Sequence, residues 1–193
     1  DIAEEFNFPK EKIFVTHLAA EDMYRPIDRA YCKKFIKDNY KIADNFILYV
    51  GGYSPRKNII GILEAFSLLK DNLKEDLKIV ITGKKGISYE IYKNKAIELG
   101  ISNSVIFTDF IPLNDLPIFY NACEFLVYPS FYEGFGLPPL EAMACGVPVI
   151  ASNVTSLPEV CRNSAILIDP NDIDELCYSM ERVLTDSFLK LTM

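Results

Sequence analysis

The chain has 193 residues, of which half are hydrophobic and 24% are charged. This length allows one well-filled core, and the composition is that of an ordinary globular protein, so a disordered or fibrous protein is excluded. The net charge of −7 and the absence of any basic run longer than two residues argue against nucleic acid as a partner.

Five cysteines and a single histidine offer little material for a metal or redox site. The cysteines are odd in number, lie far apart and form no CxxC pair, so we expect reduced thiols, no metal and no cofactor. No run approaches the roughly 20 apolar residues of a membrane-spanning helix, and the start has no signal-peptide character. A cytoplasmic location is therefore predicted. The chain begins without an initiator methionine, and we expect an excised fragment.

The first 44 residues carry the weakest pattern. The stretch KIFVTH at 12–17 could add a strand, and residues 29–37 could form a polar helix. We interpret residues 1–44 as a linker entering from a missing amino-terminal domain, and His17 within it as structural. Residues 45–193 are expected to form a Rossmann-like, nucleotide-sugar-binding domain.

From residue 46 onward, short apolar runs alternate with longer amphipathic stretches. This alternation predicts an α/β fold, a Rossmann-like doubly wound parallel sheet with helices on both faces. The expected strands are 46–50, 77–82, 105–108, 125–128, 147–151 and 165–168. The expected helices begin at residues 58, 89, 113, 139, 157 and 172, and the expected caps are Asn58, Asn114 and Asn171.

Ligands of such sheets bind beyond the carboxyl ends of the strands, where the loops gather. The unusual residues fall in these loops. The loop after the first strand carries Arg56 and Lys57, and the loop after the third reads DFI at 109–111. Glycines, cations and carboxylates are therefore predicted to converge on one edge of the sheet.

The stretch PSFYEGFGLPPLEAMACG at 129–146 is the most informative. Gly134 and Gly136 allow close approach of the backbone to a ligand, and the free N–H groups of the following helix suit a diphosphate. Glu141 is expected in the first helical turn, eight residues after Glu133. Taken singly, such a glutamate is usually surface and such a glycine pair is usually a turn. The combination favours a binding site.

This stretch closely resembles the retaining glycosyltransferases of family 4, in which two glutamates stand with seven residues between them. The likeness covers most of the chain from residue 46 to about 184. In that family a GT-B fold places the nucleotide-sugar donor in a carboxyl-terminal Rossmann-like domain. The resemblance implies that this chain is the donor-binding half of a GT-B fold.

The resemblance also implies residue roles. Glu133 would contact the donor sugar near its transferred carbon, and Lys57 would neutralise the diphosphate; these two are the expected catalytic residues. Glu141 would hold the ribose hydroxyls. The other expected donor-binding residues lie in the same loops and are Gly52, Arg56, Asp109, Ile111, Gly134, Phe135, Gly136 and Leu137.

Two positions depart from the family pattern. Tyr53 follows Gly52 where many members have an arginine, so a diphosphate contact is either missing or supplied by Arg56. Asp109 stands where a glycine commonly contacts the base, which leaves the nucleotide open. The phrases PRKN and LPEV favour GDP-mannose. Thr155 and Ser156 would either cap the next helix or contact the ligand.

The predicted function is transfer of a sugar, with retention of configuration, from a nucleotide sugar to a saccharide or lipid-linked acceptor in glycan or cell-surface polysaccharide synthesis. The acceptor would bind through the missing amino-terminal domain, so the fragment alone should be inactive, and the full-length protein could associate peripherally with a membrane. A nucleotide-binding module without transfer activity is the alternative. A dinucleotide-dependent oxidoreductase is disfavoured, because GGYSPRK is not a GxGxxG loop.

Overall fold

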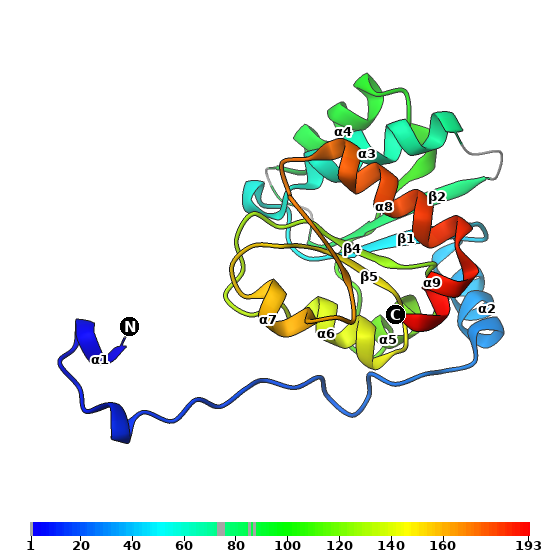
Figure 1. Cartoon of the computed structure of the whole chain (residues 1–193). Coiled ribbons are helices and arrows are strands. Elements are labelled where there is room, and N and C mark those ends of the chain that lie inside the picture. The colour runs from blue at the N-terminus through cyan, green and yellow to red at the C-terminus, as the bar shows by residue number, and fades with distance from the viewer. Residues whose placement is uncertain (1, 73–75, 85, 87) are drawn as a thin grey trace.

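The computed structural model describes residues 2–72, 76–84, 86 and 88–193 and contains one six-stranded sheet (Figure 1). Its strand order is β3-β2-β1-β4-β5-β6, and every pair of neighbours is parallel. The strands are β1 Asn45–Val50, β2 Leu77–Thr82, β3 Val105–Phe107, β4 Leu126–Tyr128, β5 Val149–Ser152 and β6 Ile166–Ile168. The predicted doubly wound parallel sheet is confirmed.

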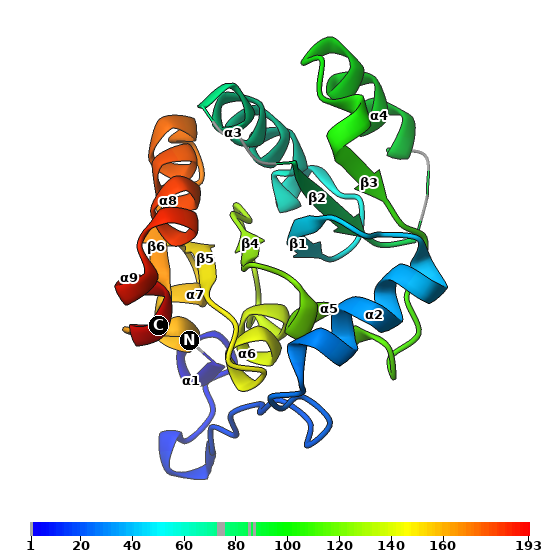
Figure 2. The ribbon, with the colours of Figure 1, turned by 90° about the vertical axis from the view of Figure 1, so that its right-hand side faces the viewer.

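Helices cover both faces of this sheet (Figure 2). On one face α3 (Ile59–Asn72) packs against α8 (Ile173–Thr185). On the other, α5 (Leu116–Ala122) packs between α2 (Arg29–Tyr40) and α6 (Leu137–Ala144). The remaining helices are α1 Ile2–Glu5, α4 Tyr89–Glu98, α7 Leu157–Cys161 and α9 Ser187–Thr192, with 3-10 turns η1 Lys10–Lys12, η2 Pro55–Lys57 and η3 Ser102–Ser104.

The central strands are buried because both of their faces carry apolar side chains. Residues 46–49 of β1 and all of β4 are buried, as a parallel sheet between two helical layers requires. Four of the five cysteines are buried as well. None of the helices in the described part of the chain has the length and apolar character needed to cross a bilayer.

Several local expectations were wrong. Residues 13–17 form no strand. The expected helix starts at residues 113 and 139 lie at Leu116 and Leu137. Asn58 does accept a hydrogen bond from the Gly61 N–H at 3.2 Å, as a capping side chain would.

The other two expected caps fall one residue early. The residue at the cap position of α5 is Asp115, not Asn114, and its side chain makes no capping hydrogen bond. Asp172, not Asn171, caps α8 by accepting from the Glu175 N–H at 2.8 Å. In each case an aspartate directly follows the asparagine, and aspartate and asparagine cap about equally well.

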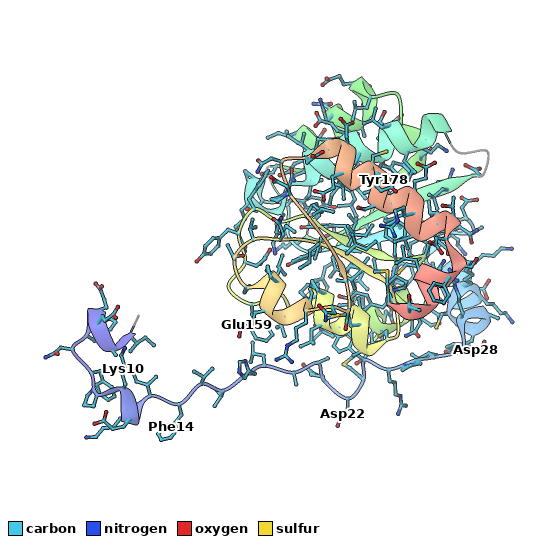
Figure 3. The ribbon with its side chains drawn as sticks, viewed as in Figure 1. Lys10, Phe14, Asp22, Asp28, Glu159 and Tyr178 are labelled. Atoms are coloured by element: carbon cyan, nitrogen blue, oxygen red, sulfur yellow. The ribbon has the colours of Figure 1, made fainter. Side chains whose placement is uncertain are left out.

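The first residues run as an extended segment away from the body of the molecule (Figure 1). Lys10 and Phe14 lie on this segment (Figure 3). Its exposed apolar side chains are Ile2, Phe6, Phe8, Phe14, Val15 and Leu18. The predicted helix at 29–37 is confirmed as α2, which runs to Tyr40.

Candidate functional site

The site lies where the winding of the sheet reverses. The chain moves outward from β1 to β2 and β3, then returns to place β4 on the other side of β1. The loops after β1 and β4 therefore flank this reversal point, here called the crevice, which is the usual ligand site of such sheets. The Phe131 N–H donates to the Arg56 carbonyl at 2.8 Å, so the two loops are joined.

A carboxylate and two cations form the centre of this crevice. Lys57 Nζ lies 2.5 Å from Glu133 Oε1, and Arg56 Nη1 lies 3.2 Å from Glu133 Oε2. Lys57 and Glu133 are both buried, whereas Arg56 is about half exposed. The structure thus brings together three residues that are far apart in the sequence.

The charge of Glu133 is stabilised in this setting. Burial acts to raise the pKa of its carboxyl, but the hydrogen bond from Lys57, the nearby hydroxyl of Ser130 and the charge of Lys57 outweigh it, so the pKa lies below its ordinary value. Lys57 Nζ also donates to the hydroxyl of Tyr128 at 2.7 Å. The crevice therefore holds an ionised carboxylate beside a buried ammonium.

Thr155 and Ser156, which precede α7, form hydrogen bonds with the backbone of the loop that carries Glu133. Thr155 Oγ1 accepts from the Glu133 N–H at 3.1 Å, and the Ser156 hydroxyl donates to the carbonyls of Glu133 and Phe135 at 3.1 and 2.6 Å. Ser156 is the N-cap of α7 by position, but its side chain makes no capping hydrogen bond. Of the two alternatives expected for Thr155 and Ser156, capping through the side chains was therefore wrong, and contact with a ligand stays a prediction. Their hydroxyls shape the site loop.

The loop leads into α6 with its backbone donors free. Among the described residues, the N–H groups of Gly134, Phe135, Gly136 and Leu137 have no hydrogen-bond acceptor. Gly136 precedes the helix with φ 117°. Four peptide donors at the start of a helix can bind an anion, because the helix dipole adds to their partial charges.

Glu141 has a different environment. It was expected in the first turn of the helix, but it is the fifth residue of α6 and so lies beyond that turn. Its Oε2 accepts from the Tyr120 hydroxyl at 2.7 Å, and Tyr24 also interacts with it. Burial raises the pKa of Glu141 above its ordinary value, although the hydrogen bonds from Tyr120 and Tyr24 act against the shift.

The remaining expected donor residues divide between two places. Gly52 and Ile111 line one cavity of about 240 Å³ at the ends of β1, β2 and β3. Asp109 is not among the residues that line it; this side chain is exposed, and its Oδ1 accepts from the Phe110 N–H at 2.8 Å. The Tyr53 hydroxyl donates to the carbonyls of Ile81 and Thr108 at 3.3 and 3.2 Å.

A second cavity, of about 400 Å³, changes the interpretation of His17. This exposed side chain lines the cavity together with Gly134 and Phe135. His17 was expected to be structural because the site was placed elsewhere; the cavity brings it beside two expected donor-binding residues, and its role stays a prediction. The opposite wall includes Glu159 of α7, which points toward the extended segment in Figure 3.

No metal centre is evident in the part of the chain that the structure describes. There, no group of three histidine, cysteine, aspartate or glutamate side chains is arranged to hold an ion. The absence of a metal or cofactor stays a prediction. The chemistry available at the crevice is electrostatic: peptide donors, two cations and a carboxylate.

Sequence comparison gives this geometry a family. Residues 33–192 match the model of the glycosyl transferases group 1. The chain belongs to this family. A relative among curated proteins is the O-antigen chain mannosyltransferase B of Escherichia coli, which is 40% identical over 188 residues; these cover 96% of this chain and 49% of that protein. The chain thus spans about half the length of this mannosyltransferase.

Two solved structures share the fold of this group 1 domain. One is the C-terminal domain of the group 1 protein LpcC from Francisella tularensis, with a TM-score of 0.78, 24% identity, and coverage of 90% of this chain and 91% of that one. The other is Anabaena HepE in complex with UDP and glucose, with a TM-score of 0.83, 20% identity and coverage of 98% and 52%. The chain therefore has the fold of the C-terminal half of a GT-B glycosyltransferase.

Sequence reasoning missed three residues around the site. Tyr128 ends the apolar run FLVY, whose pattern predicts a strand and gives no sign of a role at the site. Tyr120 lies inside a helix, and Ser130 precedes the glycine-rich loop. Only the position of Tyr128 and Ser130 at the carboxyl end of a central strand could have indicated their proximity to a ligand.

Proposed function

We propose that this chain is the donor-binding half of a retaining glycosyltransferase that transfers mannose from GDP-mannose to a saccharide or lipid-linked acceptor in cell-surface polysaccharide synthesis. The observation that supports it best is the buried Lys57 beside Glu133 and the free amides of 134–137. A diphosphate needs such cations and donors as charge develops on it during departure. The 40% identity to an O-antigen chain mannosyltransferase supports the sugar.

In this proposal the diphosphate binds between Lys57, Arg56 and the amides of the α6 entry. Glu133 is then close to the transferred sugar, and its ionised state suits contact with developing positive charge at the anomeric carbon. The base occupies the cavity lined by Gly52 and Ile111, and Glu141 contacts the ribose. The acceptor attacks from the side of the leaving phosphate, whose oxygen takes its proton.

The test uses the full-length protein and measures release of GDP from GDP-mannose, with UDP-glucose and ADP-glucose as competitors. We expect Glu133→Ala to lower kcat by about a hundredfold or more, the loss found when one electrostatic group of a site is removed. Glu181→Ala, on the exposed surface of α8, is the matched control and should keep wild-type activity. Full activity of Glu133→Ala would exclude this site assignment.

A second measurement separates transfer from simple nucleotide binding. The chain of 193 residues alone should bind GDP, seen by calorimetry, yet release no GDP from GDP-mannose. The full-length protein should both bind and turn over. Binding without turnover by the full-length protein would favour a nucleotide-binding module.

A further inference from the structure

Lys57 is held by two acceptors of different charge. Its ammonium has three N–H donors. One reaches the ionised Glu133 at 2.5 Å and another reaches the hydroxyl of Tyr128 at 2.7 Å. Nζ also lies 4.9 Å from the centroid of the Tyr128 ring. The third donor remains for an incoming anion.

The two acceptors affect the lysine charge differently. The negative charge of Glu133 offsets part of the attraction of the ammonium for a diphosphate, because an incoming anion interacts with both charges. A neutral phenol oxygen orients the ammonium and leaves its charge intact. Burial and the nearby charge of Glu133 raise the pKa of Tyr128, so its hydroxyl stays neutral.

Tyr128 is placed to give such orientation because it belongs to the sheet. It is the last residue of β4, pairs with Ala151 of β5 and is 1% exposed. Its ring stacks on Tyr49 of β1, with centroids 6.2 Å apart and an interplanar angle of 20°. Lys57 ends the short 3-10 turn η2 and Glu133 stands on a loop, so the phenol is the one member of the three that belongs to the sheet.

Glu133 keeps Arg56 as a donor at 3.2 Å if Lys57 turns its charge toward a diphosphate, and Ser130 offers a further hydroxyl nearby. The Ser130 hydroxyl is buried and has no hydrogen-bond partner of acceptable geometry among the described residues. It nevertheless lies close enough to Glu133 to lower the pKa of that carboxyl. We infer that Ser130 donates to Glu133 once Lys57 has turned.

We propose that Tyr128 is a positioning residue for Lys57. This inference rests on the proposed function. As the leaving diphosphate gains charge, the Tyr128 oxygen keeps the ammonium aimed at it, while Glu133 serves the sugar and takes the Ser130 hydrogen bond. Tyr128 itself does not contact the donor; it acts through Lys57, and its hydroxyl also helps to lower the pKa of the Glu133 carboxyl.

The test compares Tyr128→Phe with the wild type in the full-length enzyme. Phenylalanine keeps the ring that stacks on Tyr49 and removes only the oxygen. We expect kcat to fall about 10- to 100-fold, the usual effect of losing one hydrogen bond to a charged group, while the donor KM changes less than about threefold. An unchanged kcat would overturn the proposal.

Tyr40→Phe is the matched control. Tyr40 donates to Asp115 Oδ2 at 2.5 Å, so this change also removes a phenol hydrogen bond to an ion, but away from the crevice. It should lower the melting temperature and leave kcat unchanged. An equal loss of kcat in both variants would mean that Tyr128 acts only through stability, which overturns the proposal.

A double-mutant cycle tests the route through Lys57. In the background of Lys57→Ala, adding Tyr128→Phe should change kcat by less than about twofold, because coupled residues are not additive. A full multiplicative loss would overturn the positioning role while leaving the proposed function in place. A wild-type enzyme that releases no nucleotide from any donor would instead overturn the proposed function, and this inference with it.

Discussion

Glu133 and Glu141 stand eight residues apart and experience opposite environments. Glu133 faces a lysine and an arginine, and its pKa lies below the ordinary value. Glu141 is buried against two phenols, and its pKa lies above the ordinary value. A negative charge is therefore stabilised at the first position and costly at the second, which suits two different roles.

The raised pKa of Glu141 predicts a stability effect of Glu141→Gln. A carboxyl with a raised pKa in the folded state loses stability as pH rises from its ordinary pKa through the raised one. The amide keeps the oxygen that accepts from Tyr120 and removes the charge. We expect Glu141→Gln to melt about 2 to 4 °C above the wild type at pH 8 and level with it at pH 3.5.

Calorimetry at both pH values checks this, and GDP titration should show weaker binding by the same variant. Glu181→Gln, on the exposed face of α8, should shift neither quantity. A Glu141→Gln protein that melts below the wild type at pH 8 would contradict the prediction.

Thr155 holds the site loop from an unfavourable backbone conformation. Its φ of 56° is rare for a β-branched residue, and its Oγ1 accepts from the Glu133 N–H. Thr155→Val removes this acceptor and keeps the branching. We expect kcat/KM for the donor to fall about 5- to 20-fold, the effect of one lost hydrogen bond. Steady-state kinetics measure it, and Thr155→Ser, which retains the hydroxyl, should stay within about twofold of wild type.

At the scale of elements, the entry into α6 depends on one glycine. Gly136 has φ 117°, and a Cβ there would lie 2.6 Å from Leu157 Cδ2 of α7. An L side chain is strained on both counts. We expect Gly136→Ala to lower the free energy of unfolding by about 1 to 3 kcal/mol and to weaken GDP binding.

Gly134→Ala is the matched control in the same loop. A Cβ at Gly134 meets no atom within 4 Å. Urea unfolding of this variant should give a stability within about 1 kcal/mol of wild type. Equal losses of stability at the two positions would contradict this prediction, because only Gly136 has the positive φ and the close approach to Leu157.

The cap positions of α5 and α8 each lie one residue beyond the asparagine expected as the cap. The sequence NDLP at 114–117 and the sequence NDI at 171–173 each offer two adjacent capping residues. Propensity ranks asparagine and aspartate alike, so the pattern cannot choose between them. Packing of α5 and α8 against the rest of the molecule sets where each helix begins.

At the scale of the molecule, the largely buried carboxylate of Glu124 connects the first helix of the folded body, α2, to its last helix, α9. Glu124 lies just before β4. Its carboxylate accepts hydrogen bonds from Arg29 of α2 and, at 2.5 Å, from Lys190 of α9. Burial acts to raise the pKa of Glu124, but the hydrogen bond from Lys190 and the charge of Arg29 outweigh it, so the pKa is lowered. This cluster anchors α2 and α9 to the centre of the sheet.

Glu124→Gln should lower the free energy of unfolding by about 2 kcal/mol at pH 7, because Arg29, Lys33 and Lys190 lose the negative charge with which they pair. A lowered pKa gives stability that is present above the ordinary pKa of glutamate and is lost as pH falls through the folded value, so the difference should shrink below about pH 4. Urea titrations at pH 7 and pH 3.5 measure this. Glu98→Gln, which removes an exposed partner of Lys95, should cost less than about 0.5 kcal/mol.

The sequence by itself determined the alternating α/β architecture, the strands and the loop that carries Glu133, because apolar periodicity and glycine placement are local properties of the chain. The pairing of Lys57 with Glu133 also follows from the strand order once β1 and β4 are known to be neighbours. Only the tertiary structure decided that Tyr128 supports Lys57, that Tyr120 reaches Glu141, and that Thr155 and Ser156 hold the site loop instead of capping a helix. These contacts join residues between 21 and 71 positions apart, and which hydroxyl meets which partner depends on how the helices and loops pack on the sheet.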